Sequence, residues 1–107
     1  MGPSVKPSKP YRPEPIETSA VALEPELLEL TERLAQNAHD LWGRQRLSQG
    51  WTQGEERDDT HKRHPCLVSY DELPESEKDY DREMALGTLK AILALGYRIV
   101  LPSGKPA

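Results

Sequence analysis

Residues 25–42 read Pro25-Glu-Leu-Leu-Glu-Leu-Thr-Glu-Arg-Leu-Ala-Gln-Asn-Ala-His-Asp-Leu-Trp42, and this stretch decides the fold. Pro25 suits the first position of a helix, where its missing N–H loses no hydrogen bond. Apolar side chains then recur at steps of three and four residues, which is the period of one helical face. We therefore predict a helix from about Pro25 to Leu47, ended at Gly50, whose apolar stripe consists of Leu27, Leu30, Leu34, Ala38 and Leu41.

A second helix is predicted from about Pro74 to Leu95, again with a proline near its start and glutamates in its first turn. Gly96 is placed to end it with a left-handed residue. Gly87 lies in its middle, where glycine costs up to ~1 kcal/mol relative to alanine, so we expect a close helix crossing there. The apolar stripe of this helix consists of Ala85, Leu89, Ile92 and Leu93, widened by Leu86 and Leu95.

The segment from Gly50 to Ser69 loses this periodicity and is predicted to be a long loop. We expect the loop to be ordered, because burying the large ring of Trp51 would stabilise one conformation. Residues 66–68 are a candidate short strand, and residues 97–101 are predicted to form another. The fold class expected is therefore mainly α, with two amphipathic helices joined by a long ordered loop and flanked by short β-strands.

The chain has 107 residues, which is enough for one hydrophobic core. Residues 1–15 are rich in proline and are predicted to form an extended arm. We assign the folded domain to residues 16–102 and a tail to residues 103–107. A core of this size is only modestly stable by itself, so help from a partner or a second copy is expected.

Composition excludes several classes of partner. The net charge of −4 argues against a DNA or RNA polymer, because binding a phosphate backbone needs an excess of basic side chains. No apolar run approaches the ~20 residues of a membrane span, and the start of the chain lacks the apolar core of a signal peptide. Cys66 stands alone, so no disulfide framework is expected. We therefore expect a cytoplasmic protein that does not bind membranes.

Several motifs, in order and without a large gap, resemble the repeat that occurs in the cytoplasmic part of ryanodine receptors and singly in bacterial and phage proteins. They cover about ninety residues. They are Tyr11-Arg-Pro-Glu-Pro-Ile-Glu-Thr, Glu32-Arg-Leu-Ala-Gln-Asn-Ala-His-Asp-Leu-Trp42, Gln49-Gly-Trp-Thr-Gln-Gly, Arg57-Asp-Asp, His64-Pro-Cys-Leu-Val, Tyr70-Asp-Glu-Leu-Pro, Glu77-Lys and Thr88-Leu-Lys-Ala-Ile-Leu-Ala-Leu-Gly-Tyr-Arg-Ile.

The resemblance implies a mainly helical fold and a non-catalytic role. Receptor repeats occur as tandem pairs with an approximate two-fold axis, so a homodimer is the expected equivalent for a single repeat. Paired repeats can hold an adenine nucleotide in the cleft between them, lined by the tryptophan of a His-x-x-Trp motif. The matching residues here are His39 and Trp42. The function implied is a ligand-binding or sensor module, and the alternative is a protein-interaction scaffold without a small ligand.

The ligand-binding residues predicted on this basis are His39, Trp42, Arg46 and Arg57. Trp42 would stack on a base and His39, on the same helical face, would hydrogen-bond to it. Arg46 or Arg57 would meet a phosphate. Each has a structural alternative: Trp42 at the edge of the core, His39 hydrogen-bonded to a loop carbonyl, and Arg57 paired with a carboxylate.

Five further residues are predicted to hold the loop in shape. Trp51 would anchor it, Asp58 would cap a turn, with its neighbour Asp59 as the alternative cap, and the remaining three belong to the family motifs: His64, Pro65 and Tyr70. His61, His64 and Cys66 fit no common zinc spacing, so no metal site is predicted, and no cofactor is implied. No nucleophile motif or paired general acid and base can be placed, which argues against an enzyme.

Overall fold

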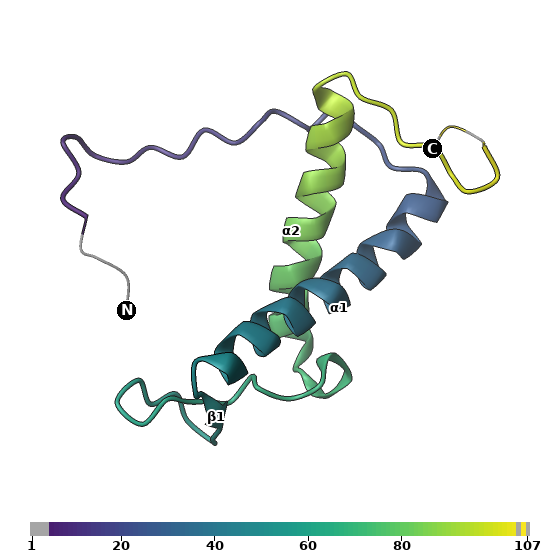
Figure 1. Cartoon of the computed structure of the whole chain (residues 1–107). Coiled ribbons are helices and arrows are strands. Elements are labelled where there is room, and N and C mark those ends of the chain that lie inside the picture. Colours follow the sequence, from purple (N-terminus) through teal and green to yellow (C-terminus); the bar gives the residue numbers. More distant parts are fainter. Residues whose placement is uncertain (1–4, 105, 107) are drawn as a thin grey trace.

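The computed structural model describes residues 5–104 and 106 of the chain. It has two long helices, α1 (Pro25–Ser48) and α2 (Glu75–Ala94), which cross each other in Figure 1. The segment between them holds two short strands, β1 (Thr52–Gln53) and β2 (Arg63–His64), and a 3-10 turn, η1 (Tyr70–Glu72). The predicted fold class is confirmed. The predicted arm and tail extend beyond the described residues at positions 1–4, 105 and 107.

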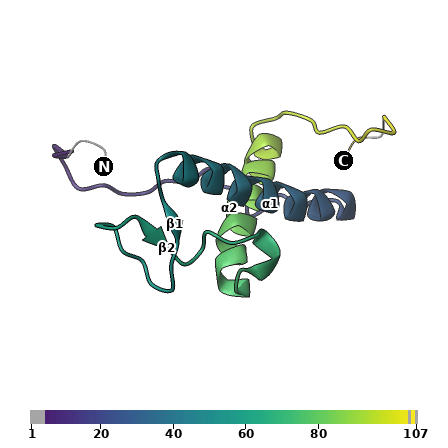
Figure 2. The ribbon, with the colours of Figure 1, turned by 60° about the horizontal axis from the view of Figure 1, so that its bottom comes forward.

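The core lies where the two helices and the loop meet. Its central cluster is Ala35 of α1, Tyr70 of η1 and Leu73, with Cys66 and Val68 packed against it. Figure 2 shows the loop on the same side of α1 as the first turns of α2. The loop is therefore part of the folded unit, as its aromatic residues predicted.

The apolar stripe predicted on α1 is displaced from the face that is buried. The structure buries Leu27, Thr31, Ala35 and His39, whereas Leu34 and Leu41 are 36% and 48% exposed. Polar residues fit this buried face because they find partners there. The Thr31 hydroxyl, for example, donates a hydrogen bond of 2.8 Å to the carbonyl oxygen of Leu27.

The strands lie elsewhere than the two segments proposed for them. β1 and β2 pair in parallel within the loop, with Thr52 opposite Arg63 and Gln53 opposite His64. Residues 66–68 form turns and bends, and residues 97–101 contain only an isolated bridge between Val100 and Pro106. Where these short strands form depends on the geometry of the turns around them. Hydrophobic patterning does not encode that geometry.

Glycines end both helices as predicted, since Gly50 has a φ of 89° and Gly96 a φ of 93°. Gly54 is required beside the strand pair, because a Cβ there would lie 2.8 Å from the Cβ of Arg63. The close crossing expected at Gly87 is not found. Within the described part of the chain, no atom outside Gly87, its two chain neighbours and the nearby backbone of α2 lies within 4 Å of where its Cβ would be.

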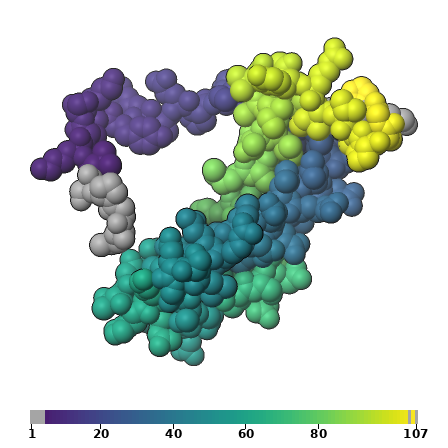
Figure 3. Space-filling view, viewed as in Figure 1, coloured from purple at the N-terminus to yellow at the C-terminus, as the bar shows by residue number. Residues whose placement is uncertain are grey.

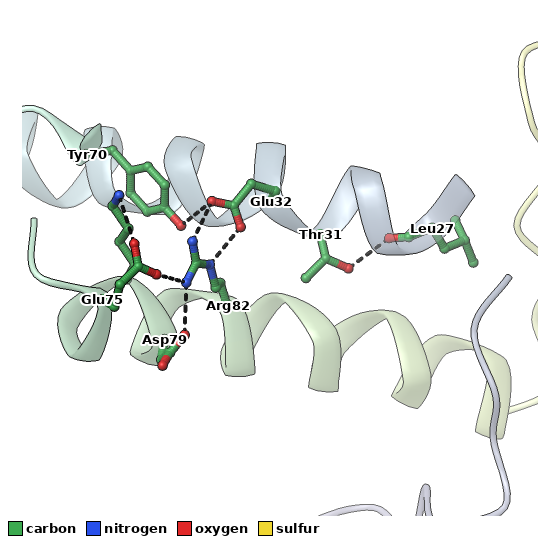
Figure 4. Close-up of polar contacts among 8 residues, drawn as sticks. Leu27, Thr31, Glu32, Tyr70, Glu75, Asp79 and Arg82 are labelled. Atoms are coloured by element: carbon green, nitrogen blue, oxygen red, sulfur yellow. Dashed lines mark hydrogen bonds and ion pairs between the residues drawn. The ribbon is translucent and has the colours of Figure 1, made fainter. Parts of the chain in front are cut away.

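A network of charges joins the two helices on one side of the crossing (Figure 4). The guanidinium group of Arg82 donates hydrogen bonds to Glu32, at 2.7 and 3.0 Å, to Glu75 at 2.7 Å and to Asp79 at 3.0 Å. The Tyr70 hydroxyl donates a further bond of 3.0 Å to the Glu32 carboxylate. The network therefore links η1 to α1 through Glu32, and α1 to α2 through the pair of Glu32 and Arg82.

The N-terminal segment runs outside this unit. Figure 3 shows the described part of the arm standing away from the helices, and Val5 and Tyr11 are 83% and 84% exposed. Across residues 5–104 and 106, neither helix has the length and apolar character needed to cross a membrane.

Candidate functional site

Aromatic rings gather at the C-terminal half of α1, where the loop folds back against it. The rings of His39 and Trp42 stack with centroids 5.6 Å apart, and the ring of His64 is steeply inclined to that of Trp42, at 75°, with centroids 4.9 Å apart. His39 is buried, and its Nε2–H donates a hydrogen bond of 2.7 Å to the carbonyl oxygen of Val68. This bond fixes the imidazole, so one side of Trp42 is held by a rigid neighbour.

His64 is held in its neutral form by its surroundings. Its Nδ1 accepts a hydrogen bond of 3.0 Å from the backbone N–H of Cys66, which leaves the other ring nitrogen to carry the proton. Burial lowers the pKa of His64 below its ordinary value, and the nearby charges of Arg57 and Arg46 lower it further. Protonation would therefore cost both this hydrogen bond and the desolvation of a cation.

We expect the free energy of unfolding to decrease as the pH falls below the ordinary histidine pKa of 6.5. The sign follows because His64 binds a proton more readily in the unfolded chain than in the folded one. Urea denaturation at a series of pH values would measure the effect. His64→Asn, which keeps an acceptor near the Nδ1 position and cannot be protonated, is expected to remove most of this dependence.

The exposed His61 provides the matched control for that measurement. Its side chain is 70% exposed and is bonded to Asp58 at 2.7 Å. His61→Gln should leave the loss of stability at low pH in place. If His61→Gln removes the dependence and His64→Asn does not, the attribution to His64 is wrong.

Beside Trp42 lies a cleft of about 240 Å³ with one acidic wall. Glu77 and Asp81 of α2 supply that wall. Burial raises the pKa of Asp81, and the neighbouring Glu77 raises it further. The pKa of the Cys66 thiol is raised in the same way, by burial and then by Glu77. The cleft is lined by His39, Trp42, His64, Cys66, Leu73, Glu77, Tyr80 and Asp81.

A second hollow lies next to this cleft and is basic. The guanidinium carbon of Arg46 is 6.0 Å from the ring centre of Trp42 and 5.1 Å from that of Trp51, so Arg46 borders both hollows. The Nε of Arg57 already donates a bond of 2.8 Å to Asp59, and Lys62 donates one of 2.8 Å to the carbonyl oxygen of Gln49. The lining residues are Arg46, Gln49, Trp51, Arg57, Asp59, Thr60 and Lys62.

The predicted ligand-binding residues are thus divided between two adjacent hollows. His39 and Trp42 line the acidic cleft, whereas Arg46 and Arg57 line the basic one. His39 also has the hydrogen bond to a loop carbonyl that its structural alternative describes. Arg57 likewise has the carboxylate partner of its structural alternative.

The residues assigned to the loop lie within or beside it. Trp51 and Tyr70 are 9% and 4% exposed. The Asp58 carboxylate accepts a hydrogen bond of 3.1 Å from the backbone N–H of His61, which caps the turn over these residues. Pro65 follows β2 in a turn and is half-buried.

Sequence reasoning missed the acidic wall, formed by Glu77 and Asp81, and the basic side chain of Lys62. The two carboxylates are four residues apart and so share one face of α2, which the sequence does show. What it does not show is that this face meets Trp42. No group of three or more histidine, cysteine, aspartate or glutamate side chains suited to a metal ion occurs among residues 5–104 and 106.

Two crossed helices with a long ordered loop packed at their contact define a small, mainly helical domain. The family model of the RyR domain matches residues 11–101 of this chain. The chain therefore belongs to the RyR domain family, and the resemblance inferred from its motifs is confirmed. The match begins at Tyr11, within the segment that we assigned to the arm.

Proposed function

We propose that this chain is a non-catalytic, cytoplasmic ligand-binding module that takes a nucleotide or a related aromatic phosphate in a cleft completed by a second copy. The observation that carries the proposal is the position of the Arg46 guanidinium close to the rings of both Trp42 and Trp51. An aromatic cleft and a basic hollow meet there, so one ligand could place its ring in the first and its phosphate in the second.

The chemistry of each hollow suits one half of such a ligand. A base stacked on Trp42 would gain roughly 1–3 kcal/mol from the aromatic face. The carboxylates of Glu77 and Asp81 accept hydrogen bonds, so they favour a ring that carries N–H donors. They would repel a phosphate, which therefore belongs with Arg46 and Lys62 on the other side.

The size of the cleft supports the role of a second copy. At about 240 Å³ it is smaller than the ~300–1,000 Å³ of typical small-molecule sites. It also opens to solvent beside Tyr80, which is 67% exposed. A further surface placed against this edge would enclose a ligand that the single chain covers only in part.

The test is tryptophan fluorescence together with thermal shift, against ATP, ADP, cyclic mononucleotides and cyclic dinucleotides. The chain has two tryptophans, so Trp51→Phe leaves Trp42 as the only reporter. We expect saturable quenching and a rise in melting temperature for at least one nucleotide. Trp42→Ala should weaken that binding by about tenfold or more, since it removes the stacking surface.

Circular dichroism of Trp42→Ala separates lost binding from lost folding, because Trp42 is only half-buried. Arg46→Ala should weaken binding of the nucleotide more than that of its nucleoside if the phosphate lies in the basic hollow. A flat response to the whole panel at millimolar concentrations would reject the nucleotide. Unfolding of Trp42→Ala would mean that the ring belongs to the core.

Protein interaction is the second candidate function, and exposed apolar side chains favour it. Leu28, Leu47, Met84 and Leu95 are 54–72% exposed, and contact with another protein would remove such side chains from water. This function predicts association with another protein surface and indifference to nucleotides. The panel above therefore distinguishes the two candidates.

A further inference from the structure

The side of α2 that faces away from α1 is apolar although it is exposed. Leu89 marks the buried side, and the residues on the opposite side recur at steps of three and four. Tyr80 and Met84 on that side are 67% and 72% exposed. A helix side in contact with water is ordinarily polar. This outer face of α2 consists of Tyr80, Met84, Gly87, Ala91 and Ala94.

The centre of this face is Gly87, and no neighbouring element in the described part of the chain requires a glycine there. Apart from Gly87 itself, its two chain neighbours and the nearby backbone of α2, nothing in residues 5–104 and 106 lies within 4 Å of a Cβ built on Gly87. Gly87 costs the helix up to ~1 kcal/mol relative to alanine. Ala91 follows one turn later, and Ala94 after that, so the middle of the outer face is flat. Helix axes approach most closely where the facing side chains are small.

The charges beside the outer face are arranged to pair with a copy of themselves. Glu83 and Lys90 are seven residues apart, two helical turns, and therefore lie on the same flank with Gly87 between them. Neither side chain takes part in an ion pair in the described part of the structure. In an antiparallel pair of α2 helices centred near Gly87, each Glu83 would face the other copy's Lys90.

We propose that two copies of this chain associate through the outer face of α2, with the helices antiparallel around Gly87. The inference rests on the proposed function for the pairing of two copies, and it adds the surface and the orientation. Tyr80 belongs both to this face and to the wall of the acidic cleft. The partner's helix would therefore lie along the open edge of each cleft, giving two separate sites in each dimer.

The apolar side chains exposed on α1 are the rival surface. Leu34 and Leu41 are 36% and 48% exposed, which is less than Tyr80 and Met84. The α1 stripe has no glycine between these leucines. The outer face of α2 combines greater exposure, a flat centre and self-complementary charges, so we place the dimer interface there and not on α1.

Sedimentation equilibrium of the full chain over a range of concentrations tests the charge pairing. Glu83→Lys and Lys90→Glu each convert two attractive contacts in the dimer into two repulsive ones. Each variant should raise the dimer dissociation constant about tenfold or more. The double variant Glu83→Lys/Lys90→Glu restores opposite charges in the antiparallel pair, and its dissociation constant should return to within about threefold of the original.

Gly87→Ala gives a second test, because folding and association should respond in opposite directions. Alanine is the better helix former, so the melting temperature of the monomer should rise. The added methyl group separates the two helices, so the dimer dissociation constant should rise as well, and further in Gly87→Met. A glycine that is merely exposed would give the first effect without the second.

Two results would overturn the proposal. One is a monomer mass at all concentrations; the other is a dimer that ignores the changes in α2 but dissociates in Leu41→Glu, which places the interface on α1. Nucleotide titration of Trp51→Phe is read separately. A dimer that binds no nucleotide would reject the proposed ligand and support the α2 interface. A monomer that binds a nucleotide would support the ligand and reject the interface.

Discussion

Leu27→Ala is expected to lower the free energy of unfolding by about 2–5 kcal/mol, and Leu41→Ala by less than about 1 kcal/mol. Both leucines lie on α1 and both belong to the stripe seen in the sequence. Leu27 is 1% exposed and Leu41 is 48% exposed, so only the first change leaves a cavity in the core. A small domain has about 5 kcal/mol or little more to lose, so Leu27→Ala should be partly unfolded at room temperature.

Urea denaturation followed by circular dichroism measures both values under one set of conditions. The comparison should be made at concentrations where sedimentation shows a monomer, so that association does not add to the apparent stability. Because the two substitutions remove the same atoms from the same helix, helix propensity cancels between them. Equal losses at Leu27 and Leu41 would show that the buried face of α1 is not the one described here.

The misplaced stripe on α1 shows how far hydrophobic periodicity can be taken. The period of three and four residues predicted the helix correctly, and Pro25 and Gly50 placed its ends to within one residue. It did not predict which side is buried, because the closest contact is made by Ala35 and by two polar residues, Thr31 and His39. A small side chain lets another element approach, and each polar one finds a carbonyl acceptor. Neither property increases hydrophobicity, so the larger leucines dominated the pattern.

In the candidate site, too, the sequence predicted the neighbours within one helix but not the neighbours that come from the other helix. His39 and Trp42 were found because three residues on a helix place two side chains on one face, and the structure stacks their rings. Glu77 and Asp81 come from the other helix. Their position opposite Trp42 depends on how α1 and α2 cross, which no spacing within one segment encodes.

The choice between the two predicted arginines also needed the structure. Both carry the same charge in the sequence, but Arg57 forms an ion pair of 2.8 Å with Asp59. Arg46 forms no ion pair within residues 5–104 and 106, and its guanidinium lies over two aromatic rings. A phosphate would have to compete with Asp59 for Arg57, so we expect Arg46 to contribute more to binding.

Alkaline titration should reveal the part that Tyr70 plays in joining the helices. Burial, together with the hydrogen bond to the Glu32 carboxylate, raises the pKa of Tyr70 from 10.0 to about 12. We expect the free energy of unfolding to fall by about 2–3 kcal/mol as the pH increases from 10 to 12. Denaturation in urea at several pH values, with tyrosinate absorbance followed in parallel, measures both quantities.

The sign of this effect follows from where the proton is held more tightly. A tyrosine with a raised pKa keeps its proton in the folded state after the unfolded chain has lost it, so its contribution is complete below pH 10 and disappears as the pH passes about 12. Tyr70→Phe removes the titrating group and keeps the ring, so it serves as the control for lysines that deprotonate in the same range. It should be less stable than the original chain below pH 10 and lose less stability above it. If both proteins lose stability in parallel, the Tyr70 hydroxyl does not couple the loop to Glu32 and Arg82.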